Sequence, residues 1–156
     1  EGEVQGMKIF GARAVNAMRL EKGFLHWKAD LLTEFDPFET GLDRFVKIEK
    51  PNFVGKKALE KRLVAGPRKK LCSLHLDCTH APAHGGASMK LDGKVIGTIT
   101  SGDWGHRLGM NLAYGFVDSE HSEIGTLLTV DVIGEPVSAT IIAAGPYDPN
   151  YDIIRG

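Results

Sequence analysis

The stretch MKLDGKVIGTIT, residues 89–100, decides the fold class of this chain. Its Asp92-Gly93 pair stands between two runs that alternate apolar and polar residues, and an Asp-Gly pair favours the two-residue turn of a β-hairpin. The alternation on either side predicts strands with one buried face. Residues 89–100 are therefore expected to form an antiparallel hairpin.

The sequence on both sides of this hairpin continues the pattern. Residues 71–78 alternate, residues 112–117 (LAYGFV) form another short apolar run, and residues 127–143 read as two strands around Gly134-Glu135. Several short strands at this spacing predict a small antiparallel barrel or a sandwich.

The sequence before Pro67 has a different, helical character. Apolar residues at three- and four-residue spacing over residues 7–20 predict a helix, and Gly23 is its expected end. Residues 53–65 predict a second helix, which Gly66-Pro67 ends. The chain is thus expected to be an α+β protein, with an α-rich part over residues 1–66 and a β-rich part over residues 67–156.

Two shorter elements are expected between these helices. Asp36-Pro37 offers an N-cap followed by a proline at the first helical position, and Gly41 can close that short helix. Residues 44–48 are expected to form a short strand.

Composition sets the broad class of protein. The 156 residues are 42% hydrophobic and 25% charged, which is ordinary for a globular protein that can bury a core. A net charge of −1 gives no basic footprint for nucleic acid or for an anionic membrane. Two cysteines are too few for a disulfide scaffold, which favours a reducing, cytoplasmic compartment. The missing initiator methionine fits either processing or a piece of a longer protein.

A group of cysteines and histidines invites a zinc interpretation. Its members are Cys72, His75, Cys78, His80 and His84. In an alternating strand, however, His75 faces away from the two cysteines, which share the apolar face. We therefore expect core cysteines, loop histidines and no metal site.

Two stretches are candidates for ligand binding. Residues 101–109 (SGDWGHRLG) place Trp104 and His106 between glycines, either as a ligand loop or as a plain connection between strands. Residues 19–31 (RLEKGFLHWKADL) mix seven polar or bulky aromatic positions with leucines, as the polar wall of a ligand site would. The alternative for residues 19–31 is a helix end with solvated charges.

The chain resembles a known family in an ordered series of motifs. NAMRLEKGFLHWKADL, then DPFETGLDRFVKIEKPNFVGKKAL, SGDWGHRLGMNLAYGFV and PYDPNYDIIR are similar to stretches of the glycine-cleavage T-protein (aminomethyltransferase) family. Within it, the folate-binding C-terminal portions of dimethylglycine and sarcosine dehydrogenases are the nearest look-alikes. The resemblance runs from about residue 6 to residue 155 and carries R-L-E-K-G, P-x-E-x-G-L and F-x-G-K-x-A-L motifs.

The resemblance implies a domain division and a function. Residues 1–66 would be the C-terminal end of a folate-binding domain, and residues 67–156 the C-terminal β-barrel domain. The family binds tetrahydrofolate and transfers a one-carbon unit to it. The family's catalytic aspartate lies in an earlier region, so no catalytic residue and no activity are expected in this fragment alone. Any FAD would bind a domain outside this chain.

The resemblance also implies the cofactor-binding residues. Arg19 matches the family's folate-contacting arginine, Tyr151 matches a tyrosine near the C-terminus that closes the site, and Trp27 replaces a tyrosine of the pocket wall. An arginine fork suits a carboxylate or a pterin oxygen, and aromatic rings stack on flat heterocycles. Glu21 is a further candidate participant, although the sequence favours a salt bridge at the helix end for this residue.

Several functions remain open from sequence alone. The resemblance favours the C-terminal part of a dimethylglycine or sarcosine dehydrogenase type of enzyme. The alternatives are a stand-alone aminomethyltransferase or related demethylase, a non-catalytic folate-binding or regulatory module, and a barrel that only supports a partner domain. The remainder of the same polypeptide is the expected partner, and an apolar surface near residues 7–45 predicts self-association of the fragment.

Overall fold

The computed structural model describes residues 1–156, except for the side chain of Ile154. Three α-helices are present, α1 (Ala12–Lys22), α2 (Lys56–Ala65) and the short α3 (Asp152–Arg155). The strands are β1 (Lys69–Leu76), β2 (Ser88–Leu91), β3 (Lys94–Gly105), β4 (Met110–Asp118), β5 (Leu127–Val132) and β6 (Glu135–Ile142). Single 3₁₀ turns occur at Gly2–Gln5, Asp43–Phe45 and Ser119–His121.

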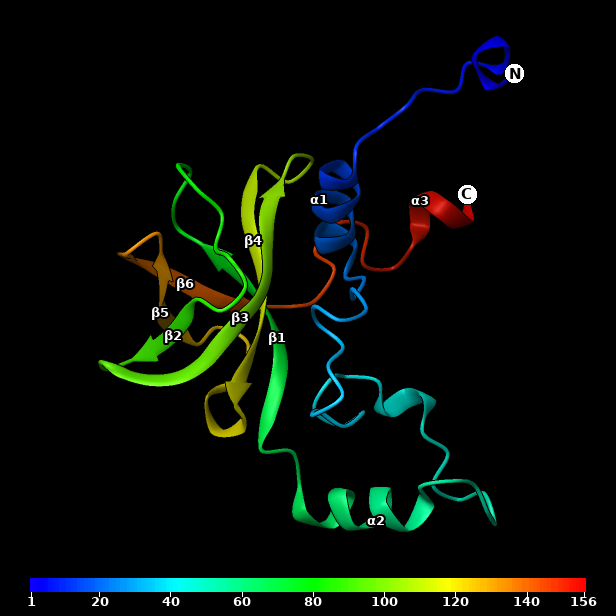
Figure 1. The fold of residues 1–156 in the computed structure, drawn as a ribbon, viewed down its shortest axis with the longest axis vertical. Coiled ribbons are helices and arrows are strands. Elements are labelled where there is room, and N and C mark those ends of the chain that lie inside the picture. The colour runs from blue at the N-terminus through cyan, green and yellow to red at the C-terminus, as the bar shows by residue number, and fades with distance from the viewer.

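The six strands close into one antiparallel barrel in the order β1-β4-β3-β2-β5-β6 (Figure 1). This resolves the choice between barrel and sandwich and confirms the α+β class. One continuous cluster of apolar side chains fills the barrel, with Leu74, Met89, Val117 and Val130 completely buried. Closure leaves no unpaired edge strand, so the barrel satisfies its own backbone hydrogen bonds.

The two expected hairpins form, one of them with a shifted turn. Asp92 and Gly93 have positive φ angles of 50° and 80°, as a two-residue type I′ turn between β2 and β3 requires. The β5–β6 turn has its positive φ angles at Ile133 and Gly134, and Val132 pairs with Glu135. The turn therefore lies one residue before the expected Gly134-Glu135 pair.

The helix predicted over residues 7–20 begins later than expected, at Ala12. Met7 and Phe10 are largely exposed and contact no core, so nothing stabilises the first predicted turn. The helix ends as expected, with Gly23 in the left-handed conformation. Its buried face carries Ala17 and Leu20, and α1 lies beside β3 and β4 (Figure 1).

The prediction of a strand over residues 44–48 is wrong, because this segment contains only the 3₁₀ turn Asp43–Phe45 and irregular backbone. A strand needs a neighbour, and the closed barrel offers none. The short helix expected after Asp36 is a hydrogen-bonded turn, in which Asp36 caps the N–H groups of Phe38 and Glu39. Helix α2, predicted over residues 53–65, forms over Lys56–Ala65 and buries no residue.

Candidate functional site

The irregular segment of residues 23–44 follows α1 and lines two cavities of similar size against the barrel. One, of about 550 Å³, lies against residues 98–100 and Phe116. The other lies against Leu71, Ser73 and Tyr114; we call it the loop cavity, and its volume is about 500 Å³. Most of its lining is apolar, with a few polar groups, which is the general character of small-molecule sites. Its side-chain lining comes from Phe24, Leu25, Leu31, Thr40, Leu42, Arg44, Leu71, Cys72, Ser73, Tyr114 and Ala144.

Arg19, the predicted folate contact, lies directly behind the wall of the loop cavity. Its guanidinium lies 5.7 Å from the ring centroid of Tyr114 and donates through Nη1 to the carbonyl oxygen of Phe24 at 3.3 Å. Both Phe24 and Tyr114 line the cavity. Nε of Arg19 donates to Asn16, while Nη2 makes no hydrogen bond among the described residues.

Asp30 is the counter-ion of Arg19 and is completely buried. Its Oδ2 accepts from Nη1 of Arg19 at 2.5 Å and from the main-chain N–H of His26 at 2.9 Å. Its Oδ1 accepts from the hydroxyl groups of Thr100 and Ser101, at a bulge in β3. A buried carboxylate with this many donors holds α1, the loop and β3 in one arrangement.

Glu21 is also buried, and it forms no salt bridge among the described residues. Its Oε1 accepts from the main-chain N–H groups of Arg107 at 2.7 Å and Leu108 at 3.1 Å. Those amides belong to the turn between β3 and β4. The interpretation as a helix-end salt bridge is therefore wrong: Glu21 instead fastens α1 to the barrel.

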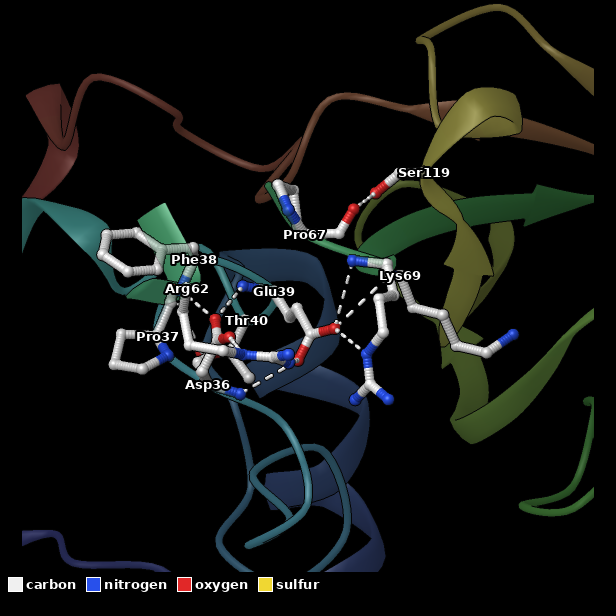
Figure 2. Close-up of polar contacts among 10 residues, drawn as sticks. Asp36, Pro37, Phe38, Glu39, Thr40, Arg62, Pro67, Lys69 and Ser119 are labelled. Atoms are coloured by element: carbon white, nitrogen blue, oxygen red, sulfur yellow. Dashed lines mark hydrogen bonds and ion pairs between the residues drawn. The ribbon is translucent and has the colours of Figure 1, made fainter. Parts of the chain in front are cut away.

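Glu39 is the third buried carboxylate of this region, and Figure 2 shows it between α2 and the start of β1. Its Oε2 accepts from the main-chain N–H of Asp36 at 3.1 Å and from Nη2 of Arg62 at 3.3 Å. Its Oε1 faces the main-chain N–H groups of Arg68 and Lys69 at 3.3 and 3.4 Å. Three buried carboxylates thus attach the N-terminal part, residues 1–66, to the barrel at three separate places.

Trp27, the second predicted folate contact, lies outside the loop cavity. Its side chain is 64% exposed and lines a neighbouring hollow of about 250 Å³. The hollow and the loop cavity share Leu31, Thr40 and Leu42 as walls. Trp27 and the loop cavity are therefore adjacent but separated by a single layer of side chains.

Tyr151, the third predicted contact, lies on the C-terminal tail beside the end of α1. Nζ of Lys22 lies 4.0 Å from the centroid of its ring and donates to the main-chain oxygen and to Oδ2 of Asp148 at 2.6 and 2.7 Å. The hydrogen bond from Lys22 holds the pKa of Asp148 below its usual range. The tail crosses α1 where Gly23 and Gly145 meet; a Cβ on Gly23 would lie 2.9 Å from Cα of Gly145.

The structure thus brings Arg19 and Trp27 to two sides of one loop and places Tyr151 against Lys22, the last residue of α1. Tyr151 lines neither the loop cavity nor the Trp27 hollow. The roles of Asp30 and Glu39 were not predicted from sequence, although both residues lie inside the motif-bearing stretches. The Glu in P-x-E-x-G-L, just after the Asp36-Pro37 turn signal, was the available clue.

Two weakly acidic groups that line the cavity, the phenol of Tyr114 and the thiol of Cys72, are held in their neutral forms. Burial raises the pKa of Tyr114 to about 12 and that of Cys72 to about 11. The hydroxyl of Tyr114 donates to the main-chain oxygen of Leu20 at 3.2 Å. Arg44 is the one guanidinium that lines the cavity, and it forms no ion pair among the described residues, so the cavity suits an apolar body with an anionic group.

Of the other sequence candidates, only Cys72 reaches this cavity. Cys72 belongs to the barrel core and lines the cavity with part of its surface, whereas Cys78 donates to the carbonyl oxygen of Ala81. The described residues contain no cluster of three or more metal-ligating side chains. Most of residues 101–109 continue β3, and the turn that follows is the one bound by Glu21. None of the helices described here is long and apolar enough to cross a bilayer.

The sequence matches two family patterns. Residues 69–148 match the glycine cleavage T-protein C-terminal barrel domain, and residues 1–50 match the GCVT N-terminal domain. The first match covers more than half of the chain and contains every strand of the closed barrel.

Individual relatives agree with these matches. The chain is 38% identical over 142 residues to mitochondrial dimethylglycine dehydrogenase of Rattus norvegicus, covering 90% of this chain and 17% of that protein. It is 35% identical over 150 residues to an aminomethyltransferase of Saccharopolyspora erythraea, covering 96% of this chain and 41% of that protein. The chain therefore spans less than half the length of these relatives.

A solved structure has the same fold. The crystal structure of glycine cleavage system aminomethyltransferase T from Bartonella henselae superposes with a TM-score of 0.85 at 25% sequence identity. The superposition covers 91% of this chain and 40% of that one. It includes stretches of both the N-terminal part and the barrel, since neither alone makes up 91% of the chain.

Proposed function

Because this chain belongs to the glycine cleavage T-protein family, we propose that it is the C-terminal part of a tetrahydrofolate-dependent one-carbon transfer enzyme. Residues 1–66 would complete a folate-binding domain together with other parts of a longer polypeptide, and residues 67–156 form its barrel domain. The observation that supports the folate proposal is Arg19, a buried guanidinium behind the Phe24 and Tyr114 wall of an apolar cavity, whose Nη2 makes no hydrogen bond among the described residues.

The chemistry of folate supports this assignment. Folate combines a flat pterin, an aromatic linker and a glutamate tail, so it needs apolar walls, stacking surfaces and cationic anchors. Arg19, Trp27 and Tyr151 supply one guanidinium and two aromatic rings. Binding would chiefly hold the reacting nitrogens of tetrahydrofolate beside the one-carbon donor, and such orientation can lower the barrier by about 7–11 kcal/mol.

The dehydrogenase type is the favoured member of the family. The 38% identity to the rat dimethylglycine dehydrogenase exceeds the 35% identity to the Saccharopolyspora aminomethyltransferase. A dehydrogenase would carry FAD on another part of the polypeptide, so flavin absorbance in the full-length protein would favour it over a stand-alone aminomethyltransferase. Folate binding without turnover in that full-length protein would instead favour a non-catalytic module.

Calorimetric titration with tetrahydrofolate tests the proposal, on this chain and on the full-length protein. Arg19→Lys keeps the positive charge that Asp30 needs but loses the planar guanidinium with its paired N–H donors. It should therefore weaken the affinity for tetrahydrofolate about tenfold or more. Arg13→Lys makes the same change on the exposed side of α1 and serves as the control. Tyr151→Phe and Trp27→Ala test the remaining contacts. Absence of saturable binding to the full-length protein would refute the folate function.

We further propose that the remainder of the polypeptide covers the exposed apolar side chains at the start of the chain. Met7, Ile9, Phe10 and Met18 are between 47% and 100% exposed. Uncovered apolar surface of this kind promotes association. The isolated chain should therefore self-associate in analytical ultracentrifugation, and the full-length protein should do so less.

A further inference from the structure

We propose that Glu39 is the positioning residue of the loop cavity: it holds the wall formed by residues 40–44 in place by joining α2 to the start of β1. For folate binding, this inference rests on the function proposed above. Its structural part stands on the contacts of Glu39 alone.

The carboxylate of Glu39 has donors on both of its oxygens. Oε2 accepts from Asp36 N–H and from Arg62, which itself donates to Oδ2 of Asp36 at 2.6 Å. Oε1 accepts from the N–H groups of Arg68 and Lys69, and Nε of Arg68 lies 3.5 Å away. Figure 2 shows these contacts converging from the turn, from α2 and from the first residues of the barrel.

The main chain of Glu39 continues the same attachment. Its carbonyl oxygen accepts from the N–H of Leu71 at 2.8 Å, and Leu71 lines the loop cavity. Thr40, Gly41, Leu42 and Arg44 follow directly and line the same cavity. Glu39 therefore joins the residues 40–44 part of the lining to the Leu71 part.

No neutral side chain can replace this carboxylate. A glutamine at position 39 has one amide oxygen and one NH₂ group, and either orientation turns the NH₂ group toward donors: Asp36 N–H and Arg62, or the amides of Arg68 and Lys69. Since the side chain is buried, water cannot relieve this conflict. Glu39→Gln should thus release the wall without changing the volume of the side chain.

Helix α2 depends on the same contacts of the Glu39 carboxylate. The helix buries no residue. Among the described residues, its side chains form hydrogen bonds to other segments only through Arg62, which binds Asp36 and Glu39, and through Lys56, which binds the carbonyl oxygen of Lys50. Without Glu39, Arg62 keeps only Asp36 as an anionic partner. The wall and α2 should therefore loosen together while the barrel keeps its fold.

Amide hydrogen exchange of the whole chain tests the structural part. In Glu39→Gln, the amides of Lys69 and Leu71 should exchange about tenfold faster or more, because their acceptor is lost or displaced. The amide of Val117, deep in the barrel, should exchange at its normal rate. Glu60→Gln is the matched control, since Glu60 lies on α2 and its contact with Lys56 is 3.8 Å long and partly exposed.

Each outcome decides the matter. Selective acceleration at Lys69 and Leu71 supports the inference. Unchanged exchange, or equal acceleration at Val117, overturns it, because the first denies the attachment and the second indicates global destabilisation.

Titration with tetrahydrofolate tests the ligand part. Glu39→Gln should weaken affinity about tenfold, whereas Val130→Ala, which destabilises the barrel core without touching the wall, should leave it unchanged. Equal weakening in both variants would assign the effect to stability and overturn a positioning role. If the unaltered protein does not bind tetrahydrofolate, the proposed function fails, and the exchange experiment still decides the role of Glu39.

Discussion

The barrel and the N-terminal part bury different kinds of side chain. Among the described residues, the barrel part holds all of the buried apolar side chains except Ala17 and Leu20. The N-terminal part instead buries Arg19, Glu21, Asp30 and Glu39, whereas Asp103 is the buried charged residue of the barrel part. Exposed large apolar side chains show the reverse distribution, with twelve of the eighteen in the described chain lying before residue 67.

This difference indicates how each part is held in place. The barrel is stabilised by the removal of apolar surface from water, which tolerates changes of similar volume. The N-terminal part depends in addition on the three buried carboxylates, and a buried charge that loses its partner is costly. Substitutions that preserve volume should therefore be mild in the barrel and severe at the carboxylates.

The largest effect is expected for Asp30→Asn. The variant leaves the guanidinium of Arg19 buried without its counter-ion, which costs about 3–5 kcal/mol. Limited proteolysis should then cut within residues 23–44, while urea unfolding monitored by barrel amides changes less. Asp131→Asn, which alters only a cap of the β5–β6 turn, is the matched control. Equal loss in both variants would remove the contrast between the two parts.

Glu21→Gln should have a smaller effect of about 1–3 kcal/mol, since only two hydrogen bonds to main-chain amides are weakened. The amides of Arg107 and Leu108 should exchange faster, as measured by hydrogen exchange. Normal protection of these two amides would show that the β3–β4 turn does not depend on α1.

Lys22→Met should release the C-terminal tail and make residues 146–156 about tenfold more accessible to protease.

The contact between Lys22 and Asp148 also predicts that stability depends on pH in acid. The folded pKa of Asp148 is lowered, so the unfolded chain takes up the proton first as the pH falls. The stabilisation is complete above the ordinary aspartate pKa and is lost as the pH falls through the lower, folded value. In Lys22→Met, the melting temperature should therefore fall less steeply as the pH is lowered through this range. The same steepness in the variant and the unaltered protein would contradict the assignment.

The smallest effect is expected on α2. Val64 is 90% exposed, so Val64→Ala should change stability by no more than about 0.5 kcal/mol. The same change at the buried Val130 should cost about 2 kcal/mol or more. Chemical denaturation of the two variants compares identical chemistry in the two parts of the chain. A large loss at Val64 would reveal a covering partner, such as a second copy.

The barrel could be predicted from sequence because its signals are local. The Asp92-Gly93 turn, the alternation over residues 71–78 and the apolar runs each specify a strand within a few residues. Closure into a barrel could not be derived from them, because it depends on β1 pairing with β6 across almost the whole domain. Only the family resemblance pointed to it.

The N-terminal part was harder to predict for the same physical reason. The segment over residues 44–48 has strand-like composition, but strand formation needs a partner that the described chain does not offer. Glu39 and Asp30 act on atoms far along the chain, at Arg68 and Thr100, so no local pattern marks them as buried. The positions of Arg19, Trp27 and Tyr151 are now described, and their contacts with folate stay a prediction.

The chemical nature of the three attachments has a consequence for how such chains can diverge. On the barrel side, Glu21 and Glu39 are received by main-chain N–H groups, and only Asp30 is received by side chains. Every residue except proline carries that N–H, so positions 68, 69, 107 and 108 can accept nearly any replacement without losing the attachment. The residue types at these four barrel positions can therefore change, whereas the carboxylates cannot. A segment that carries these three carboxylates should therefore dock onto another T-protein-type barrel that has hydroxyl groups where Thr100 and Ser101 stand.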